Sequence, residues 1–456
     1  MANVPLEVGK TYIAKCVDLN HEGMGVFKVN DFVIFSSGVI IGEEVKLEVT
    51  KVTKNYALAK VTDFITKSPS RVKPICKYFY ECGGCDLMHM DYATQLKFKE
   101  NMVLRTISKF AKLNDFEYLG IKGAKNIYHY RNKVQIPFSF RDEKTICGFY
   151  KKKSHNIIPL DECFIEPDIS TDISKFIKNL CNEYHIKGYI EESGEGIIRH
   201  VLVRNTFLSG YMVIIVSRTK DIPNISEITK KIVNRYNMVE SVILNVQEKK
   251  TNVILGDYSE VLFGKDEIID EILGYKFKLS HKSFLQINHE QTEELYKIIR
   301  EFADLKKDEV LLDAYCGVGT IGITLASSCK EVYGIEIVED AINNAKENAK
   351  LNGFDNCKYY VGKSEEIIND LEVEFDCAVF DPPRKGCDMS FLEAIVKKKV
   401  KRIVYVSCDV ATLARDLNYL KDYYDVTKVK CCDLFPNSVH VESVCLLTNR
   451  AGSTKK

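Results

Sequence analysis

The chain has 456 residues, 45% of them hydrophobic, so it can bury more than one core, and roughly two to four domains are expected. Its first ten residues lack the basic-then-apolar pattern of a secretion signal, and no apolar run reaches the ~18 to 20 residues of a membrane span, so we expect a cytoplasmic protein that binds no membrane. The formal net charge of +0 argues against a nonspecific nucleic-acid coat, and sixteen cysteines without an export signal indicate reduced thiols, metal ligands or a nucleophile and not a disulfide scaffold.

The N-terminal region, residues 1–65, is expected to consist of short strands separated by glycines. Five strands in about sixty residues predict a small β-barrel of the OB type. They are TYIAKCVDL, GVFKV, DFVIF, EEVKLEVTKV and YALAKVTDF. The segment resembles the TRAM domain that precedes several RNA-modifying enzymes, although a generic small barrel would have the same pattern.

A central α/β domain is expected over residues 66–275. It begins with a proline-containing stretch, 66–74, that is typical of a linker, and an amphipathic helix is predicted over 94–112. Three strands are expected further on: NKVQIPFSF, GIIRHVLVRN and YMVIIVS. Residues 66–155 contain 18 Lys and Arg but only 8 Asp and Glu. This excess indicates a surface that faces RNA, or alternatively a solvated basic face without a partner.

Four cysteines of this central region form a candidate metal site. Cys76, Cys82 and Cys85 have the spacing C-x5-C-x2-C, and Cys163 follows at a distance. Four thiolates can hold a zinc ion or a [4Fe-4S] cluster, and the spacing alone does not decide between the two. A second C-x2-C pair, usual in zinc ribbons, is absent from the cluster, which favours iron and sulfur.

The C-terminal region, residues 276–456, alternates between helices and strands, which predicts a parallel, doubly wound sheet. One expected strand, VLLDAY, runs into the loop CGVGT, where two glycines allow a ligand to approach the backbone. About twenty residues later the strand EVYGIE ends at Glu336, an acceptor suited to ribose hydroxyls. The loop lacks the third glycine of a pyrophosphate site, so a cofactor without phosphates fits better than a nicotinamide dinucleotide.

Three further motifs follow later strands of this sheet and can meet at the same edge. They are DPPRKG at 381–386, SCD at 407–409 and FPNSVHVE at 435–442. Carbon 5 of uracil is a poor nucleophile, so its methylation requires a thiolate that adds to carbon 6 and a base that later removes the carbon 5 proton. Cys408 and Glu442 are of the right types, although alone each would more often be a core cysteine or a structural carboxylate.

These motifs together resemble those of the RNA uracil-5-methyltransferases, a family of class I S-adenosylmethionine-dependent enzymes. The similar strings are SFLQIN, LLDAYCGVGTIG, DPPRKGC, YVSCDVATLARDL and FPNSVHVES. The resemblance implies that Cys408 is the nucleophile and Glu442 the base. It also implies that the S-adenosylmethionine pocket contains Gln286, Tyr315, Glu336 and Asp381, of which the first and last also lie near the target uracil.

The cysteine-rich string CKYFYECGGCDLMHM is similar to the iron–sulfur segment of the branch that modifies 23S ribosomal RNA, which also carries a TRAM domain. This implies a [4Fe-4S] cluster on the four cysteines. Because addition and elimination need no electron, we interpret the cluster as a structural staple for the RNA-facing domain.

We therefore expect a monomeric multidomain enzyme, with an OB-like TRAM barrel, a central iron–sulfur α/β domain and a C-terminal Rossmann-like methyltransferase domain. Its substrate would be a uridine of 23S ribosomal RNA, extruded from its stack, and DNA would not be a partner. Base and phosphate contacts are expected from Tyr128, Tyr130, Arg131 and Arg199. The alternatives are a transfer RNA uracil methyltransferase, an RNA 5-methylcytidine methyltransferase, an inactive RNA-binding protein on the same fold, and an iron–sulfur electron carrier.

Overall fold

A computed structural model describes residues 6–159 and 161–450. Residues 1–5, half of the segment in which no secretion signal was expected, lie outside them. The chain divides into two compact units. Of the described residues, the first contains 6–104 together with 151–153 and 435–440, and the second contains 105–150, 154–159, 161–434 and 441–450. Each unit is described by itself. No helix within the described residues is long and apolar enough to cross a membrane.

The first unit contains a six-stranded sheet in the order β1-β5-β6-β4-β3-β2. The alternating apolar residues of these strands form a small core that includes Phe27, Ile34 and Leu47. The expected first strand is interrupted at Cys16 and Val17 and therefore appears as two strands. The bounds are β1 (Thr11–Lys15), β2 (Asp18–Leu19), β3 (Gly25–Val29), β4 (Phe32–Ser36), β5 (Glu44–Val52) and β6 (Tyr56–Thr66).

The stretch after β6 is not the linker that its prolines suggested. Arg71 donates from Nε and Nη2 to the two carboxylate oxygens of Glu43, each at 2.6 Å, and from Nη2 to the carbonyl of Gly38 at 2.8 Å. Glu43 is fully buried. A buried ion pair with two parallel bonds is costly to break, so this stretch is fastened to the six-stranded sheet.

The helix expected over 94–112 is interrupted in its last turn. The α-helix α1 (Tyr92–Thr106) passes into a π-helical turn, η1 (Ile107–Ala111), which ends at Lys112 with a positive φ of 55°. The carbonyl of Ala111 accepts a bond from Lys421 Nζ at 2.9 Å. Tertiary contacts of this kind can satisfy a helix end that local sequence alone would continue.

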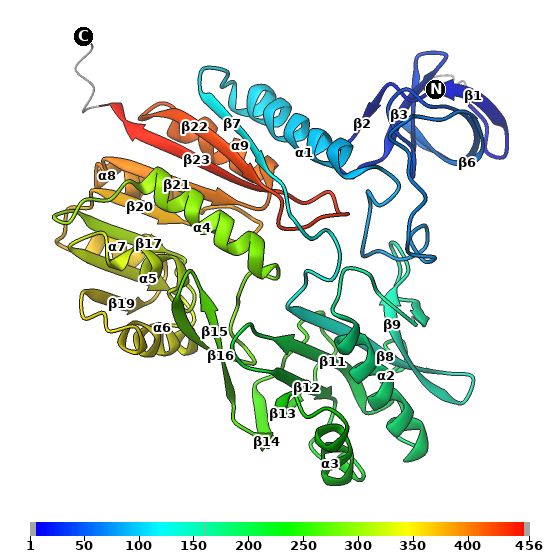
Figure 1. The fold of residues 1–456 in the computed structure, drawn as a ribbon. Coiled ribbons are helices and arrows are strands. Elements are labelled where there is room, and N and C mark those ends of the chain that lie inside the picture. The colour runs from blue at the N-terminus through cyan, green and yellow to red at the C-terminus, as the bar shows by residue number, and fades with distance from the viewer. Residues whose placement is uncertain (1–5, 160, 451–456) are drawn as a thin grey trace. The chain divides into compact units, whose positions relative to one another are not determined.

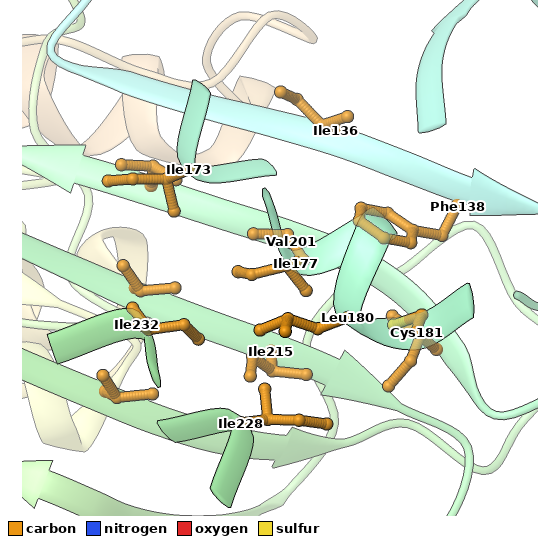
Figure 2. Close-up of a cluster of buried hydrophobic side chains, with 14 of the residues drawn as sticks. Ile136, Phe138, Ile173, Ile177, Leu180, Cys181, Val201, Ile215, Ile228 and Ile232 are labelled. Carbon is orange, nitrogen blue, oxygen red and sulfur yellow. The ribbon is translucent and has the colours of Figure 1, made fainter. Parts of the chain in front are cut away.

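The second unit contains a seven-stranded sheet in the order β10-β9-β8-β11-β12-β13-β14, covered by α2 and α3 (Figure 1). Figure 2 shows the apolar face of these helices, with Ile177 and Ile232, packed against strand residues such as Val201 and Ile215. The three strands expected from sequence correspond to β8, β11 and β12. The bounds are β8 (Lys133–Arg141), β9 (Lys144–Tyr150), β10 (Ile157–Pro159), α2 (Asp168–Glu183), β11 (Ile198–Asn205), β12 (Tyr211–Ser217), α3 (Ile225–Arg235), β13 (Val239–Val246) and β14 (Tyr258–Gly264).

The same unit contains an eight-stranded sheet in the order β19-β18-β17-β20-β21-β23-β22-β7 (Figure 1). The strands from β19 to β21 are parallel, and β23 is antiparallel to both of its neighbours. These parallel strands alternate with helices as the sequence predicts, and β17 and β18 match the expected segments VLLDAY and EVYGIE to within one residue. Their bounds are α4 (His289–Ala303), β17 (Val310–Ala314), α5 (Thr320–Ala326), β18 (Glu331–Glu336), α6 (Glu339–Leu351), β19 (Cys357–Val361), α7 (Ser364–Asp370), β20 (Cys377–Phe380), α8 (Met389–Lys397), β21 (Arg402–Ser407) and α9 (Val410–Leu420).

Sequence analysis did not identify the last strands of this sheet or its outer edge. These are β22 (Tyr424–Cys432), β23 (Glu442–Asn449) and β7 (Glu117–Lys122), the last of which pairs in parallel with β22 from about three hundred residues away. A two-stranded hairpin, β15 (Glu267–Ile272) and β16 (Tyr275–Ser280), precedes α4.

Candidate active site

The expected catalytic residues lie at the ends of neighbouring strands. In the antiparallel pair of β21 and β23, Ser407 is opposite Ser443, so the next residue on each side brings Cys408 opposite Glu442. Asp381 directly follows β20, which is the other neighbour of β21. Strand pairing therefore brings a thiol and two carboxyl groups together at one edge of the sheet.

The pKa values of these three groups are all shifted upward, in each case mainly by burial. Burial, together with the charges of Glu442 and Asp381, raises the pKa of Cys408 to about 12. Burial, followed by the charge of Asp381, raises the pKa of Glu442 well above its ordinary value. Burial also raises the pKa of Asp381 to about 7, against the lowering effect of a hydrogen bond from Gln286.

Glu442 has the features of a general base. Only 1% of its surface is exposed, and within the described residues its Oε2 atom has no hydrogen-bond partner. A buried carboxylate with a raised pKa binds a proton more tightly than one in water, which suits it to remove a proton from carbon.

Arg384 is the residue of this site to which the sequence motifs had assigned no role. Its positive charge lowers the pKa of both Cys408 and Glu442 and so opposes the effect of burial. Arg384 lies within the motif DPPRKG. A positive charge beside an expected thiolate and carboxylate was the signal by which the sequence could have identified it.

The loop that carries Arg384 is held by a buried carboxylate of α9. Asp416 Oδ2 accepts bonds from the Cys387 backbone N–H at 2.9 Å and from the Tyr405 hydroxyl at 2.6 Å. Gly386 has a φ of +75°, and a Cβ atom there would lie 2.8 Å from the same carboxylate oxygen. The string ATLARDL therefore serves to position the loop after Asp381.

Gln286 connects this site to the preceding segment of the chain. Its Nε2 donates to Asp381 Oδ2 at 3.2 Å, and its backbone carbonyl accepts from Asn132 Nδ2 at 2.9 Å. Gln286 thus lies beside Asp381.

The glycine loop after β17 has the shape of a cofactor cradle. Tyr315, Gly317 and Gly319 all have positive φ values, of 61°, 54° and 81°. A Cβ atom on Gly317 would meet nothing within 4 Å, so the backbone there is open to a ligand, whereas one on Gly319 would lie 2.8 Å from the Tyr359 hydroxyl.

The charges around this loop suit a cationic cofactor without phosphates. Glu336 ends β18 and accepts the Gly317 N–H at 3.2 Å and the Val338 N–H at 3.0 Å, which leaves lone pairs on both oxygens. Asp313, buried beneath the loop, and Asp381 add two more acids. Acidic groups repel a pyrophosphate and favour a ribose and a sulfonium, so the residues fit S-adenosylmethionine.

Replacement of Glu336 should weaken cofactor binding. The variant Glu336→Ala loses the ribose acceptor, worth ~1.5 to 3 kcal/mol for a charged hydrogen bond, so Kd for S-adenosylmethionine should rise about 10- to 150-fold in calorimetry. Glu336→Gln keeps one acceptor and should lose less. Equal Kd values for wild type and Glu336→Ala would exclude Glu336 from the pocket.

The loop before Glu442 belongs to the first unit. Gln95 of α1 accepts the Asn437 backbone N–H on Oε1 at 2.9 Å and donates from Nε2 to Asn437 Oδ1 at 3.2 Å. Asn437 is buried and has a φ of +68°. A buried amide pair from positions 342 residues apart therefore fixes the segment that ends at His440, two residues before Glu442 begins β23.

Loss of this amide pair should reduce turnover. Gln95→Ala leaves the buried Asn437 N–H without its acceptor, which costs ~1 to 3 kcal/mol and loosens the entry to Glu442. We expect a lower melting temperature and a lower kcat, with cofactor affinity unchanged. Lys97→Ala, at an exposed position of the same helix, is the control, and a Gln95→Ala enzyme as active as this control would contradict the positioning role.

One of the four expected RNA contacts is corrected by the structure. Only 4% of Arg199 is exposed, and its guanidinium donates to the carbonyls of Gln247 at 2.8 Å, Lys249 at 2.6 Å and Thr251 at 3.3 Å. Arg199 therefore braces the central sheet instead of reaching a phosphate. Tyr128, Tyr130 and Arg131 instead line a cavity of the second unit.

The expected metal ligands are divided between the two units. Cys76, Cys82 and Cys85 belong to the first and Cys163 to the second, and all four are half-buried. The Gly84 backbone N–H donates to Cys82 Sγ at 3.4 Å, a bond of the kind that stabilises thiolate ligands. Over residues 6–159 and 161–450 the structure contains no group of three or more His, Cys, Asp or Glu side chains arranged to hold a metal.

The strand order and the site define the class of this protein. Three motifs lie at the carboxyl edge of a largely parallel sheet: the glycine loop after β17, Glu336 at the end of β18 and the DPPRKG motif after β20. This is the arrangement of a class I methyltransferase. A family model described as tRNA (Uracil-5-)-methyltransferase matches residues 91–450, and a TRAM domain model matches residues 5–62. The chain belongs to this uracil-5-methyltransferase family.

Individual relatives agree with this assignment. An uncharacterized RNA methyltransferase of Clostridium tetani is 44% identical, with 98% of each chain covered, and one of Clostridium acetobutylicum is 41% identical, with 97% and 98% covered. Among solved structures, Pyrococcus abyssi tRNA (uracil-54, C5)-methyltransferase in complex with S-adenosyl-L-homocysteine is similar, with a TM-score of 0.78 and 27% identity over 96% of this chain and 99% of that one. The protein is thus an S-adenosylmethionine-dependent RNA methyltransferase of the uracil-5 type.

Proposed function

We propose that this protein methylates carbon 5 of a uridine in 23S ribosomal RNA, with Cys408 as nucleophile and Glu442 as base. The observation that carries the proposal is the strand register that brings these two residues opposite each other, next to Asp381. A thiol alone would be a core cysteine, but a thiol facing a buried carboxylate with a free oxygen has the pair of groups that this reaction needs.

The proposed reaction has two stages. The Cys408 thiolate adds to carbon 6, which breaks the carbon 5–carbon 6 double bond and leaves an enolate whose carbon 5 is nucleophilic. S-adenosylmethionine, when bound, supplies the electrophilic methyl group. Glu442 then takes the proton from carbon 5, the double bond re-forms, and the bond from carbon 6 to Cys408 breaks to regenerate the thiolate.

The neighbouring residues would support these steps. Asp381 and Gln286 form a donor and acceptor pair at the strand ends, suited to the polar edge of a uracil. Arg384 opposes the high pKa of the Cys408 thiol and so favours the thiolate. Tyr315, Gly317 and Glu336 would hold the cofactor on the other side.

The choice of 23S ribosomal RNA is supported by the cysteine-rich segment and the TRAM domain, which resemble those of the ribosomal branch. Transfer RNA is the alternative, supported by the similarity to the Pyrococcus abyssi enzyme. The test is to incubate the protein with methyl-labelled S-adenosylmethionine and unmodified transcripts of each RNA, and to map the product nucleoside. 5-Methyluridine in the 23S transcript alone supports the proposal, and label in transfer RNA alone supports the alternative.

We also propose that Cys76, Cys82, Cys85 and Cys163 hold a [4Fe-4S] cluster with a structural role. The support is chemical: four half-buried thiols, three of them within ten residues, with a backbone N–H directed to the sulfur of Cys82.

Protein purified without oxygen should be brown and contain about four irons per chain. Cys82→Ser should lose this iron, whereas Cys357→Ser, at another half-buried position, should keep it. Stoichiometric zinc without visible absorption would show that the four cysteines bind zinc and not a [4Fe-4S] cluster. A Cys82→Ser protein that keeps its fold and RNA affinity but loses methyl transfer would contradict the structural role.

A further inference from the structure

A cavity of about 690 Å³ lies in the second unit, apart from the thiol and carboxylates of the active site. Three segments that are far apart in sequence form its walls. They are residues 125–132, the end of β11 with the turn after it at 205–207, and the start of α4 at 288–290, with Asp270 of β15 between them.

A flat aromatic surface borders this cavity. The Phe207 ring stacks on the His289 ring with centroids 5.3 Å apart and an interplanar angle of 10°. Nevertheless 75% of Phe207 is exposed. The Phe207 backbone N–H donates to Asp270 Oδ1 at 2.8 Å, which fixes the turn that presents the ring. A large exposed aromatic on a rigid turn is a surface on which a nucleobase can stack.

The cavity also contains buried acceptors that lack donors. Asp270 is 1% exposed, and its Oδ1 accepts the N–H groups of Phe207 and Glu271. Its Oδ2 has no hydrogen-bond partner within the described chain, but at 3.8 Å from His289 Nδ1 it is close enough for an ion pair when His289 is protonated. The side-chain oxygen of Asn205 is a second buried acceptor without a partner there. Buried polar atoms are normally satisfied, so these two favour a ligand with N–H donors.

The polar groups of the cavity indicate a base and not a phosphate as its occupant. A phosphate has only acceptor oxygens and would be repelled by Asp270 and by Glu290, which also lines the cavity. An exocyclic amino group of adenine, cytosine or guanine supplies two N–H donors on one nitrogen, whereas uracil has no amino group and only a single N–H, at N3, on its base-pairing edge. Lys125, which is exposed, lines the same cavity and can neutralise a phosphate that flanks such a base.

The cavity shares a wall with the active site. Asn132 lines it, and the same residue donates from its backbone to the Ile287 carbonyl at 2.8 Å and from Nδ2 to the Gln286 carbonyl at 2.9 Å. Gln286 in turn bonds to Asp381. A nucleotide bound in this cavity would therefore be only a few nucleotides along the RNA from the uridine whose base reaches Cys408.

We propose that this cavity binds one unpaired RNA base with an exocyclic amino group, near the target uridine, by stacking on Phe207 and donating to Asp270 and Asn205. The proposal rests on the proposed function, since it assumes an RNA substrate, and adds to it a site that selects the sequence or loop around the target.

The test measures the binding of three fluorescein-labelled 12-nucleotide single strands: oligo(A), oligo(U) and an oligomer of purine riboside, which is adenosine without its amino group. We expect wild-type protein to bind oligo(A) about tenfold more tightly than the other two. Phe207→Ala should weaken binding of oligo(A) about tenfold, as the loss of one base stack does. Phe110→Ala removes another exposed ring, which is 57% exposed on η1, and should change nothing.

The acceptors are tested separately from the ring. Asp270→Asn replaces the free oxygen with a donor and should remove the preference for oligo(A) over the purine riboside oligomer. Thermal melting checks its fold, and Asn205→Leu, which keeps the backbone bond to Asn132, provides a second route if Asp270→Asn unfolds. A reduced preference in either folded variant supports the proposal.

Equal binding of oligo(A) and the purine riboside oligomer by wild type, or a Phe207→Ala effect no larger than that of Phe110→Ala, overturns the proposal. The assay contains no cofactor, so its outcome does not depend on methyl transfer. If the protein methylates uridine but shows no base preference, only this inference fails. If it shows the preference but makes no 5-methyluridine, only the proposed function fails.

Discussion

The Cys408→Ala enzyme should transfer no methyl group. Without the thiolate, carbon 5 of uracil is never activated, and the loss of a covalent nucleophile lowers turnover by about 10⁴-fold or more. The experiment measures label from methyl-labelled S-adenosylmethionine in RNA, together with a denaturing gel for covalent protein–RNA adducts, and both signals should be absent.

The loss must come from chemistry and not from folding or binding. Cys408 is half-buried at the end of β21, so its replacement by alanine should leave the melting temperature and the affinities for RNA and cofactor close to wild type. Cys357→Ala, at a second half-buried strand position, should remain fully active. A labelled adduct in Cys408→Ala would show that another residue is the nucleophile.

The Glu442→Gln enzyme should stall after methyl transfer instead of before it. The thiolate can still add and the methyl group can still move, but the carbon 5 proton remains and Cys408 cannot leave. Loss of a general base lowers turnover by about 10²- to 10⁴-fold. A slow-migrating protein–RNA band that carries the methyl label should therefore accumulate in this variant.

The environment of Glu442 adds a pH dependence to this prediction. Burial and the charge of Asp381 raise the pKa of Glu442, and the base acts only when it is ionised. Wild-type turnover should therefore increase as the pH rises through this raised pKa, and the labelled adduct in Glu442→Gln should not be relieved by higher pH. Glu393→Gln, at an exposed position of α8, is the control. Normal turnover by Glu442→Gln would exclude Glu442 as the base.

Several elements of this fold could be predicted because their signals are local. Strand β18 occupies the residues expected for EVYGIE, and β17 all but the last of those expected for VLLDAY, because continuous apolar runs bounded by turn residues mark buried parallel strands. The methyltransferase class and the family followed from short strings at strand ends, where the residues that contact a cofactor must lie.

Other features depended on contacts between distant residues. The edge strand β7 exists because it pairs with β22, and no local pattern marks it. Arg199 lies in a basic–aromatic segment that suggested RNA, but three backbone carbonyls from a later loop bind its guanidinium. The cavity beside Phe207 also required three separate segments to meet.

The sequence by itself thus determined which chemical groups the site contains: a thiol, carboxylates and a glycine loop. These groups follow directly from residue identity. Only the tertiary structure decided which of them face each other. The pairing of Ser407 with Ser443 brings Cys408 opposite Glu442, and the bonds from Gln95 to Asn437 hold the loop before Glu442 across 342 positions of sequence. Such contacts arise from strand register and burial. Both depend on pairing between residues that are far apart in the sequence, so a local sequence pattern does not predict them.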